Sequence, residues 1–278
     1  MALAPAFLIL VVALLAAVVT LVLVFTRGPV SRSRLERFAR RQQLPITAAN
    51  GDRVIRYLAT TRRWRVAGFL AGILLSQVGA PPRTIIHFNF VAIFFGWFLG
   101  ALLAEARVAH LEYGSVRAAS LQPRQPRRYV GRAVWALVPA AAVVVVVTLA
   151  ATAVADARQL AEPGWWRAAW TLGAGLALAA AVRWVQRSIL NRAQPLAAPD
   201  LLQADDAMRS RSLHVLSGGG AAMVGFLWLN QLGAINAAGV SGQVLAGVQL
   251  VGVFVIALAG WAVATSPSAT ATPTAAAH

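Results

Sequence analysis

The sequence predicts an all-α integral membrane protein with about seven transmembrane helices, and three observations lead to this fold class. The chain has 278 residues, of which 59% are hydrophobic and only 12% are charged, whereas a soluble domain has about 25% charged residues. Its mean hydropathy is +0.66. Apolar runs of roughly 20 residues recur along the chain, and a helix of that length crosses the ~30 Å hydrocarbon core of a bilayer. Nine acidic residues are too few to cover a soluble fold of this length.

The apolar runs define the expected transmembrane spans. The second run is short and the fifth contains Arg183, so whether these two cross the membrane fully stays open. The first run has no positive charge before it and exceeds the apolar core of a signal peptide, which indicates an uncleaved anchor. The seven expected spans cover residues 3–25, 66–79, 85–104, 133–154, 168–185, 213–232 and 244–265.

The distribution of arginine predicts the orientation in the membrane. All 25 basic residues are arginine, and segments 27–65, 107–132 and 183–211 carry eleven, six and five of them, while the alternate connections carry three. Because cytoplasmic loops are enriched in basic residues, these three segments are expected inside, with the amino terminus outside and the carboxyl terminus cytoplasmic. An alanine-rich chain with arginine in place of lysine is typical of GC-rich bacterial genomes, so the expected location is a bacterial plasma membrane.

The expected organisation has four parts. Residues 1–26 form a transmembrane anchor, and residues 27–65 form an arginine-rich cytoplasmic segment that lies in the membrane interface. Residues 66–264 form a bundle of six transmembrane helices. Residues 265–278 are rich in alanine, threonine, serine and proline and are expected to be a disordered cytoplasmic tail.

Two amphipathic helices are expected in the segment after the first span. Leu35 and Phe38 lie on one face of the first, and Pro45 ends it. Asn50 or Asp52 could cap the second. Helices with an apolar face and a basic face lie at the bilayer surface, so anionic lipid headgroups are the expected partners, although a cytoplasmic protein could use the same surface. The arginines expected to contact headgroups are Arg34, Arg37, Arg40, Arg41, Arg53, Arg56, Arg62 and Arg63.

A nucleic-acid partner is excluded by the spread of the charge. The net charge is +16, but a nucleic-acid-binding domain gathers its basic residues on one folded face. Here the arginines are distributed over every expected cytoplasmic loop, as membrane topology requires.

Glycines at helical spacing predict close helix packing. Small residues let helix backbones approach each other in lipid, and short connections after the second and sixth spans predict two tight helical hairpins. Three consecutive glycines, residues 218–220, lie in the sixth span. This glycine triplet could instead break the helix, as in transporters with discontinuous helices. The glycines assigned to packing are Gly68, Gly72, Gly96, Gly100, Gly218, Gly219, Gly220 and Gly225.

One group of polar residues is expected at the outer side of the membrane. His87 and Asn89 begin the third span, and Asn230 and Gln231 end the sixth. If the hairpins pack together, these four residues line an external vestibule that could bind a ligand. Hydrogen bonds between helices are the alternative use for such side chains.

A second group lies at the expected cytoplasmic ends of the spans. Glu105 and His110 are five residues apart, a spacing that does not place both on one helix face for a metal, so Glu105 is expected at a solvated helix end, paired with an arginine such as Arg107. Asp205 and Arg209 have the i, i+4 spacing of an ordinary ion pair, and Asp206 lies beside them.

The residue types that are missing from the sequence exclude several kinds of chemistry. Without lysine there is no retinal or pyridoxal-phosphate Schiff base and no P-loop, and without cysteine there is no thiolate metal site or thiol nucleophile. We expect no metal or cofactor and no catalytic residue set. The expected function is therefore a non-enzymatic membrane subunit or scaffold. The alternatives are a permease component that works with a separate ATPase, and an interfacial lipid-modifying enzyme that uses Glu105 or the aspartates.

Overall fold

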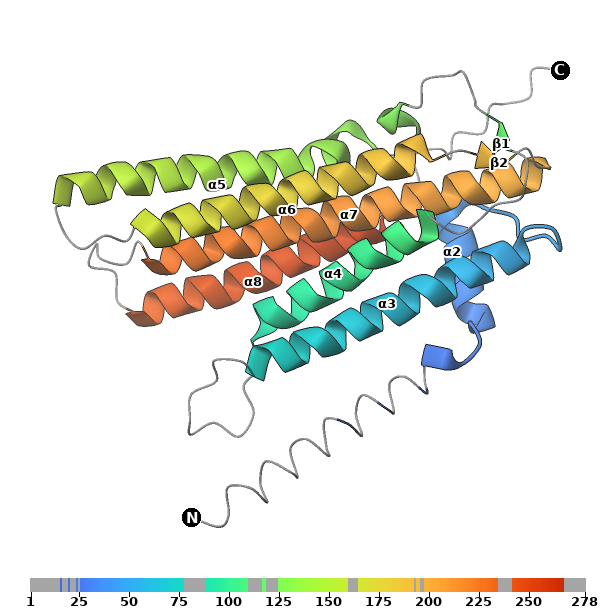
Figure 1. The fold of residues 1–278 in the computed structure, drawn as a ribbon, viewed down its shortest axis with the longest axis horizontal. Helices are drawn as coiled ribbons and strands as arrows, with labels where there is room; N and C mark the ends of the chain where they lie inside the picture. The colour runs from blue at the N-terminus through green and yellow to red at the C-terminus, as the bar shows by residue number, and fades with distance from the viewer. Residues whose placement is uncertain are drawn as a thin grey trace, which may run out of the picture. The chain divides into compact units, whose positions relative to one another are not determined.

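The computed structural model is built almost entirely of α-helices (Figure 1). It describes residues 26–77, 89–109, 117–118, 125–159, 165–192, 194–195, 198–234 and 242–267, together with Ala16, Thr20 and Val24. Most of the predicted first span and most of the predicted tail therefore lie outside the described residues. Within the described part of the chain, the all-α fold class is confirmed.

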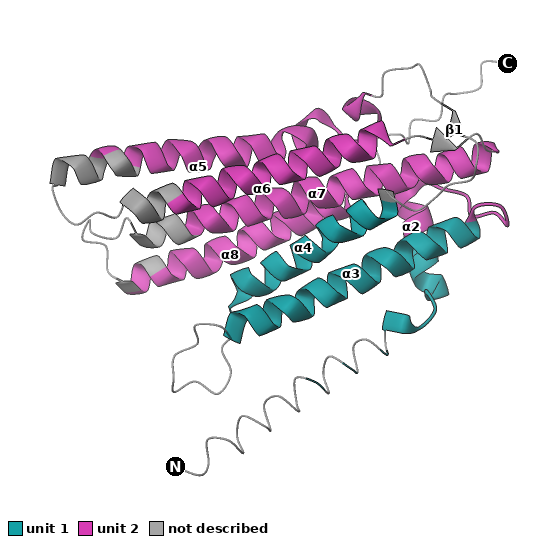
Figure 2. Ribbon diagram, in the orientation of Figure 1, with its two compact units in different colours: residues 1–37, 51–108 teal, residues 38–50, 109–278 magenta. Residues whose placement is uncertain are grey.

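The chain forms two compact units (Figure 2). Unit 1 comprises residues 1–37 and 51–108, and unit 2 comprises residues 38–50 and 109–278. Each unit contains one of the two predicted helical hairpins.

Unit 1 is built mainly on α3 (Gly51–Gln77) and α4 (Phe90–Ala109). The predicted boundary at residue 65 falls inside α3, because the interfacial helix and the second span form one continuous helix. No proline or glycine interrupts the chain between Asp52 and Val66, so nothing in the local sequence stops the helix. Asn89 precedes α4, and its side-chain oxygen accepts a hydrogen bond from the Ala92 N–H at 3.1 Å, which makes it the N-cap of this helix.

Glycines bring the backbones of α3 and α4 into contact, as predicted. A Cβ atom at Gly72 would lie 2.7 Å from the carbonyl oxygen of Ala92, and one at Gly96 would lie 2.6 Å from the Cα of Gly72. Gly68 and Gly100 face the opposite backbone in the same way. Any side chain larger than hydrogen at these positions would force the two helices apart.

The amphipathic helix α2 (Arg32–Gln42) is present where the sequence predicts it. It ends three residues before Pro45, because Gln43 adopts the left-handed conformation with φ 49° and the Leu44 N–H bonds the Ala39 carbonyl. Asn50 is the residue before α3, but its side chain accepts from the Thr47 N–H and donates to the Pro45 carbonyl. It therefore closes the preceding turn.

Unit 2 contains four long helices that lie side by side (Figure 1): α5 (Arg132–Gln159), α6 (Trp165–Asn191), α7 (Pro199–Ala234) and α8 (Gly242–Thr265). Helix α7 packs against each of the other three. Its apolar segment is 78% buried, whereas that of α8 is 6% buried. Helix α7 is therefore the core of unit 2, and α8 exposes most of its apolar surface.

The glycine triplet does not break α7, so that alternative is wrong. A Cβ atom at Gly218 would lie 3.0 Å from the Ala264 backbone nitrogen in α8, and one at Gly220 would lie 3.1 Å from Val182 in α6. Gly219 is buried between them, and Gly225 is packed against Ile256. The triplet thus allows two neighbouring helices to approach α7, and the close packing predicted for the second hairpin is confirmed.

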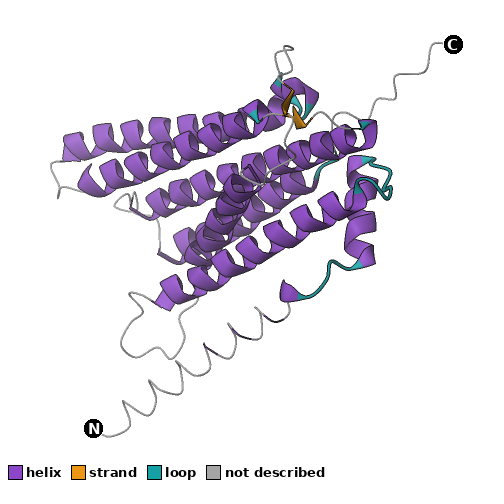
Figure 3. Ribbon diagram, turned by 45° about the vertical axis from the view of Figure 1, so that its right-hand side comes forward, coloured by secondary structure: helices purple, strands orange, loops and turns teal. Residues whose placement is uncertain are grey.

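Two short strands and a 3-10 helix accompany the four long helices of unit 2 (Figure 3). Strand β1 (Arg117–Ala118) pairs antiparallel with β2 (Gln194–Pro195), and a 3-10 turn, η1 (Pro126–Arg128), precedes α5. These elements lie in two of the arginine-rich segments.

Four of the described helices are long and apolar enough to cross a membrane. These candidate spans are Phe90–Val108, Arg132–Ala151, Pro199–Leu229 and Ala246–Thr265. They coincide with the third, fourth, sixth and seventh predicted spans. Helices α3 and α6 occupy the positions of the second and fifth predicted spans, but neither is among the four candidate spans. A total of seven crossings therefore stays a prediction.

Candidate functional site

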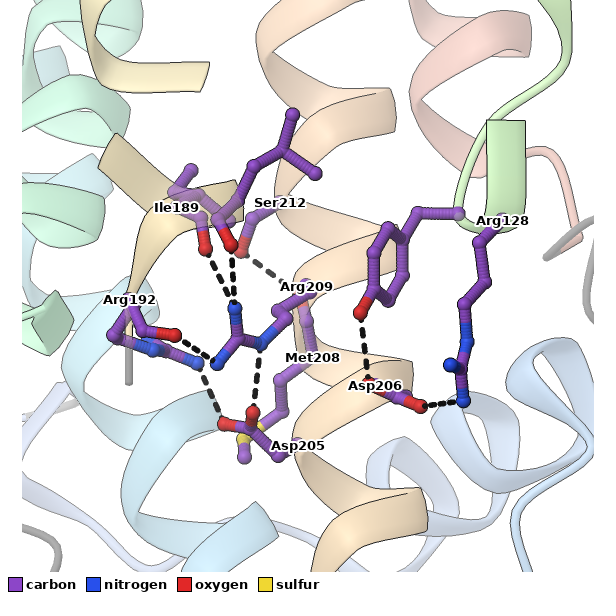
Figure 4. Close-up of polar contacts among 10 residues, drawn as sticks. Arg128, Ile189, Arg192, Asp205, Asp206, Met208, Arg209 and Ser212 are labelled. Atoms are coloured by element: carbon purple, nitrogen blue, oxygen red, sulfur yellow. Dashed lines mark hydrogen bonds and ion pairs between the residues drawn. The ribbon is translucent and has the colours of Figure 1, made fainter. Parts of the chain in front are cut away.

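A buried ion pair lies near the start of α7. Arg209 Nε donates to Asp205 Oδ2 at 2.7 Å, and both side chains are 0% exposed. The predicted i, i+4 pair is therefore present, but it is not the solvent-exposed pair that its spacing alone indicates. Arg192, which follows α6, also donates to Asp205, at 2.7 Å through Nη2 (Figure 4).

Arg209 also caps the carboxyl end of α6. Its Nη1 donates to the carbonyl oxygens of Ile189 and Leu190 at 2.8 and 3.2 Å, and its Nη2 donates to that of Arg192 at 2.8 Å. The last carbonyls of a helix have no partner within it and carry its negative partial charge. One guanidinium thus satisfies these carbonyls and neutralises Asp205, and this fixes α6 against α7 (Figure 4).

Asp206, on the neighbouring face of α7, holds the chain that leads into α5. Tyr129 donates its hydroxyl to Asp206 Oδ1 at 3.1 Å, and Arg128 Nη2 donates to Oδ2 at 3.0 Å. Burial and the negative charge of Asp206 raise the pKa of Tyr129 above its ordinary value. The phenol therefore remains a proton donor to the carboxylate at neutral pH.

Further polar contacts continue along α7. Ser210 Oγ donates to the Tyr129 carbonyl at 2.9 Å, and His214 Nδ1 lies 2.8 Å from the Ser210 carbonyl. Gln186 of α6 donates to Ser217 Oγ at 2.9 Å, and both residues are buried. All of these partners belong to unit 2, so the polar side chains of α7 connect it to its own neighbours.

Arg183 is the charged residue within the fifth predicted span. It has two partners within unit 2. Its guanidinium lies 4.2 Å from the centroid of the Trp135 ring, and its Nη1 donates to Gln186 Oε1 at 3.2 Å. These contacts accommodate a cation on α6 close to apolar helices.

Glu105 in unit 1 is buried, and the prediction of a solvated helix end is wrong. Glu105 is only 1% exposed, and the hydroxyl of Tyr57 on α3 donates a hydrogen bond to its Oε1 at 3.4 Å. The cause is the close approach of α3 and α4, which covers this face of α4. Arg107 is exposed in the last turn of α4, and His110 lies outside the described residues.

The predicted external group is only partly described. Asn89 is exposed and serves as the cap of α4, a use of the side chain that needs no ligand. His87 lies outside the described residues, as do the side chains of Asn230 and Gln231 near the end of α7. A shared vestibule therefore stays a prediction.

The arginines assigned to lipid headgroups differ in exposure. Arg53 is buried, and Arg41 and Arg62 are half-buried. The remaining five are exposed: Arg34, Arg37, Arg40, Arg56 and Arg63.

Sequence reasoning missed the partners that distant segments supply to α7. These are Tyr129, Gln186 and Arg192. Arginines at the ends of α6 were assigned to membrane topology, and no local spacing relates Tyr129 to Asp206, 77 residues further on. The one available signal was the carboxylate pair beside an arginine in an otherwise apolar region.

These features define an α-helical protein that has four helices suited to cross a membrane and a structural polar network in its central helix. Among the described residues, no group of three or more histidine, aspartate or glutamate side chains could hold a metal ion. The chain matches no protein-family model, and no curated protein or solved structure is significantly similar to it.

Proposed function

We propose that this chain is a non-enzymatic, membrane-embedded subunit that packs against another protein. One observation carries this proposal: the ionisable side chains of the α7 network serve internal contacts. Asp205 and Arg209 are fully buried, and the Tyr129 hydroxyl and Arg128 both donate to Asp206. Proton relays and ion-coupled transporters usually place ionisable groups along the substrate path, whereas these groups join the helices of one unit.

The proposal includes the finer topology that the sequence predicts. The chain crosses the membrane seven times, with segments 27–65, 107–132 and 183–211 in the cytoplasm. The four candidate spans and the arginine distribution support this arrangement. In a bacterial plasma membrane the arginines of these segments contact anionic headgroups.

The permease and lipid-enzyme alternatives have less support. The uninterrupted helix α7 offers no discontinuity of the kind that lines many transporter sites. A lipid enzyme would depend on Glu105 or on the pair Asp205 and Asp206. Glu105 and Asp205 are buried, and Asp206 accepts hydrogen bonds from Tyr129 and Arg128.

An apolar face of α8 is the surface that we assign to the partner. Leu250, Phe254, Leu258 and Trp261 recur at helical spacing and are all well exposed. Helix α8 is less covered by the rest of the chain than any of the other three candidate spans. A face of this kind contacts either lipid or another membrane helix.

The test is to purify the tagged full-length chain from native membranes in mild detergent and to identify and count the proteins that co-elute. We expect a stoichiometric partner. Combined alanine substitutions at Leu250, Phe254 and Leu258 should reduce its recovery, whereas alanine at Val143 and Val147, exposed on α5, should not.

The other outcomes of this purification are equally informative. A chain that elutes alone at its own mass contradicts the proposal. If a stoichiometric ATPase co-elutes, the result favours the permease component, because the chain itself has no nucleotide-binding motif and such a permease needs a separate ATPase.

A further inference from the structure

Arg183 on α6 is held at the surface of unit 2 by two neighbouring side chains. Its guanidinium lies over the Trp135 ring of α5, 4.2 Å from the centroid, and its Nη1 donates to Gln186 Oε1 at 3.2 Å. Gln186 is itself fixed, because its amide donates to Ser217 Oγ of α7. Arg183 is half-buried, and none of its nitrogens is both buried and without a hydrogen-bond partner. The part of the guanidinium that Gln186 does not use is therefore accessible from outside the unit.

Arg187 lies one turn further along α6, beside Arg183. Residues four apart on a helix share a face, with about 5–6 Å between their Cβ atoms, and the Arg187 side chain is exposed. Within the described part of the chain, no carboxylate forms an ion pair with either arginine. Asp205 and Asp206 of the α7 network are paired with other arginines. These two adjacent cations therefore attract an anion from outside unit 2.

The exposed surface of α6 changes from apolar to polar at this point. Between residues 173 and 181 every exposed residue of α6 is glycine, alanine or leucine. After Trp184, which is well exposed, the exposed residues of α6 are Arg187, Ser188 and Asn191. Tryptophan is enriched where the hydrocarbon core of a membrane meets the headgroups. This order of residues indicates that Arg183 and Arg187 lie at the level of the headgroups.

Helix α8 supports the same boundary. A Cβ atom at Gly260, the residue before the exposed Trp261, would lie 2.8 Å from the carbonyl oxygen of Gly218 in α7. Gly220, two residues further along α7, packs against α6 at a position two residues before Trp184. Two residues correspond to roughly 3 Å along a helix. The tryptophans of α6 and α8 therefore lie at nearly the same level of unit 2, as expected for an interfacial belt.

We propose that Arg183 and Arg187 form a binding site for the headgroup of one anionic phospholipid. Guanidinium groups bind phosphate oxygens through paired, charge-assisted hydrogen bonds. Arg183 loses little freedom on binding, because Trp135 and Gln186 already hold it. The acyl chains lie along the apolar surface of α6, where a Cβ atom at Gly173 would meet no atom within 4 Å. The site rests on the proposed crossing of the membrane by α6, and not on a protein partner.

A discrete site and a general attraction of arginines to the membrane predict different results for matched variants. For a discrete site, Arg187→Gln weakens retention of the lipid by about tenfold, the effect of losing one hydrogen bond to a charged group. Arg56→Gln removes an exposed arginine from α3 in unit 1. It should change retention by less than about twofold, because salt screens a diffuse attraction. Trp135→Leu keeps both charges but releases Arg183, so retention falls by about threefold.

The experiment measures the lipid that the full-length protein retains. The protein is reconstituted into vesicles of mixed phosphatidylcholine and phosphatidylglycerol, extracted in mild detergent and analysed by native mass spectrometry. Preferential retention of phosphatidylglycerol that is lost in Arg187→Gln and kept in Arg56→Gln supports the site. Equal retention of the two lipids, or equal effects of these two variants, overturns it. Arg187 is exposed, so its replacement keeps the test decisive even if Trp135→Leu disturbs the fold.

The crossing of the membrane by α6 is tested separately. Ser188 is exposed one residue after Arg187, and Ser188→Cys should react with a membrane-impermeant thiol reagent only after the cells are permeabilised. Labelling in intact cells contradicts the topology and overturns the lipid site with it. If labelling follows the topology but the two lipids are retained equally, the lipid site alone is wrong.

Discussion

Replacing Arg209 with methionine is expected to lower the free energy of unfolding by about 3–5 kcal/mol, because it removes one member of a buried ion pair and leaves the other charged. Asp205 would lose its bond to Arg209 but keep the bond from Arg192, and the last carbonyls of α6 would lose the bonds that Arg209 donates. Methionine is close to arginine in length but has no hydrogen to donate. Chemical denaturation in detergent, followed by circular dichroism, measures this change.

The matched control is Arg128→Met. Its ion pair with Asp206 is at the surface, with 61% of the Arg128 side chain exposed. A pair of this kind contributes at most about 1 kcal/mol. If the two variants are destabilised equally, Arg209 does not hold α6 against α7 in the way described above. Arg209→Lys should be less destabilising than methionine, because it keeps a positive charge beside Asp205, but it should still be destabilising because a single ammonium cannot reproduce all the bonds of the guanidinium.

Gly96→Leu is expected to separate α3 from α4. A Cβ at this position would already lie 2.6 Å from the Cα of Gly72, so the backbone of one helix has to move. Overpacking of this severity costs about 3 kcal/mol or more, and Gly96→Ala should have a smaller effect in the same direction. Hydrogen exchange measures the result directly, as a loss of protection along both helices.

Two helical glycines provide the control for this prediction. A Cβ at Gly173 in α6 or at Gly247 in α8 would meet no atom within 4 Å. Alanine at either position should leave the stability unchanged or raise it by up to about 1 kcal/mol, because alanine favours the helix. Faster exchange in these controls than in Gly96→Ala would show that the glycines of α3 and α4 are not packing residues.

The sequence was sufficient to predict the helices and hairpins because these depend on local patterns. The length of an apolar run is set by the thickness of the bilayer, and the four candidate spans fall where such runs occur. Glycine pairs four residues apart predicted the α3–α4 contact, since close backbone approach needs residues without a side chain. Helix α3 continues through the predicted boundary at residue 65, because a change from polar to apolar residues does not end a helix.

The polar network could not be predicted in the same way, because its partners come from separate segments. An i, i+4 spacing identified Asp205 and Arg209, but their burial depends on the end of α6, about 20 residues earlier in the sequence. Glu105 was expected in solvent since its own helix offers no partner, whereas the partner lies on α3. Tyr129 lies beside Asp206 because α5 and α7 pack together, and no local pattern shows that contact.

Single-cysteine labelling tests whether the chain crosses the membrane seven times with its amino terminus outside. The chain has no cysteine, so all labelling of a variant comes from its one introduced cysteine. A membrane-impermeant thiol reagent should label Thr84→Cys and Ser241→Cys in intact cells. Ser33→Cys and Gln125→Cys, in the arginine-rich segments, should be labelled only after permeabilisation. Labelling of Ser33→Cys and Gln125→Cys in intact cells, or equal labelling of all four, would contradict the topology.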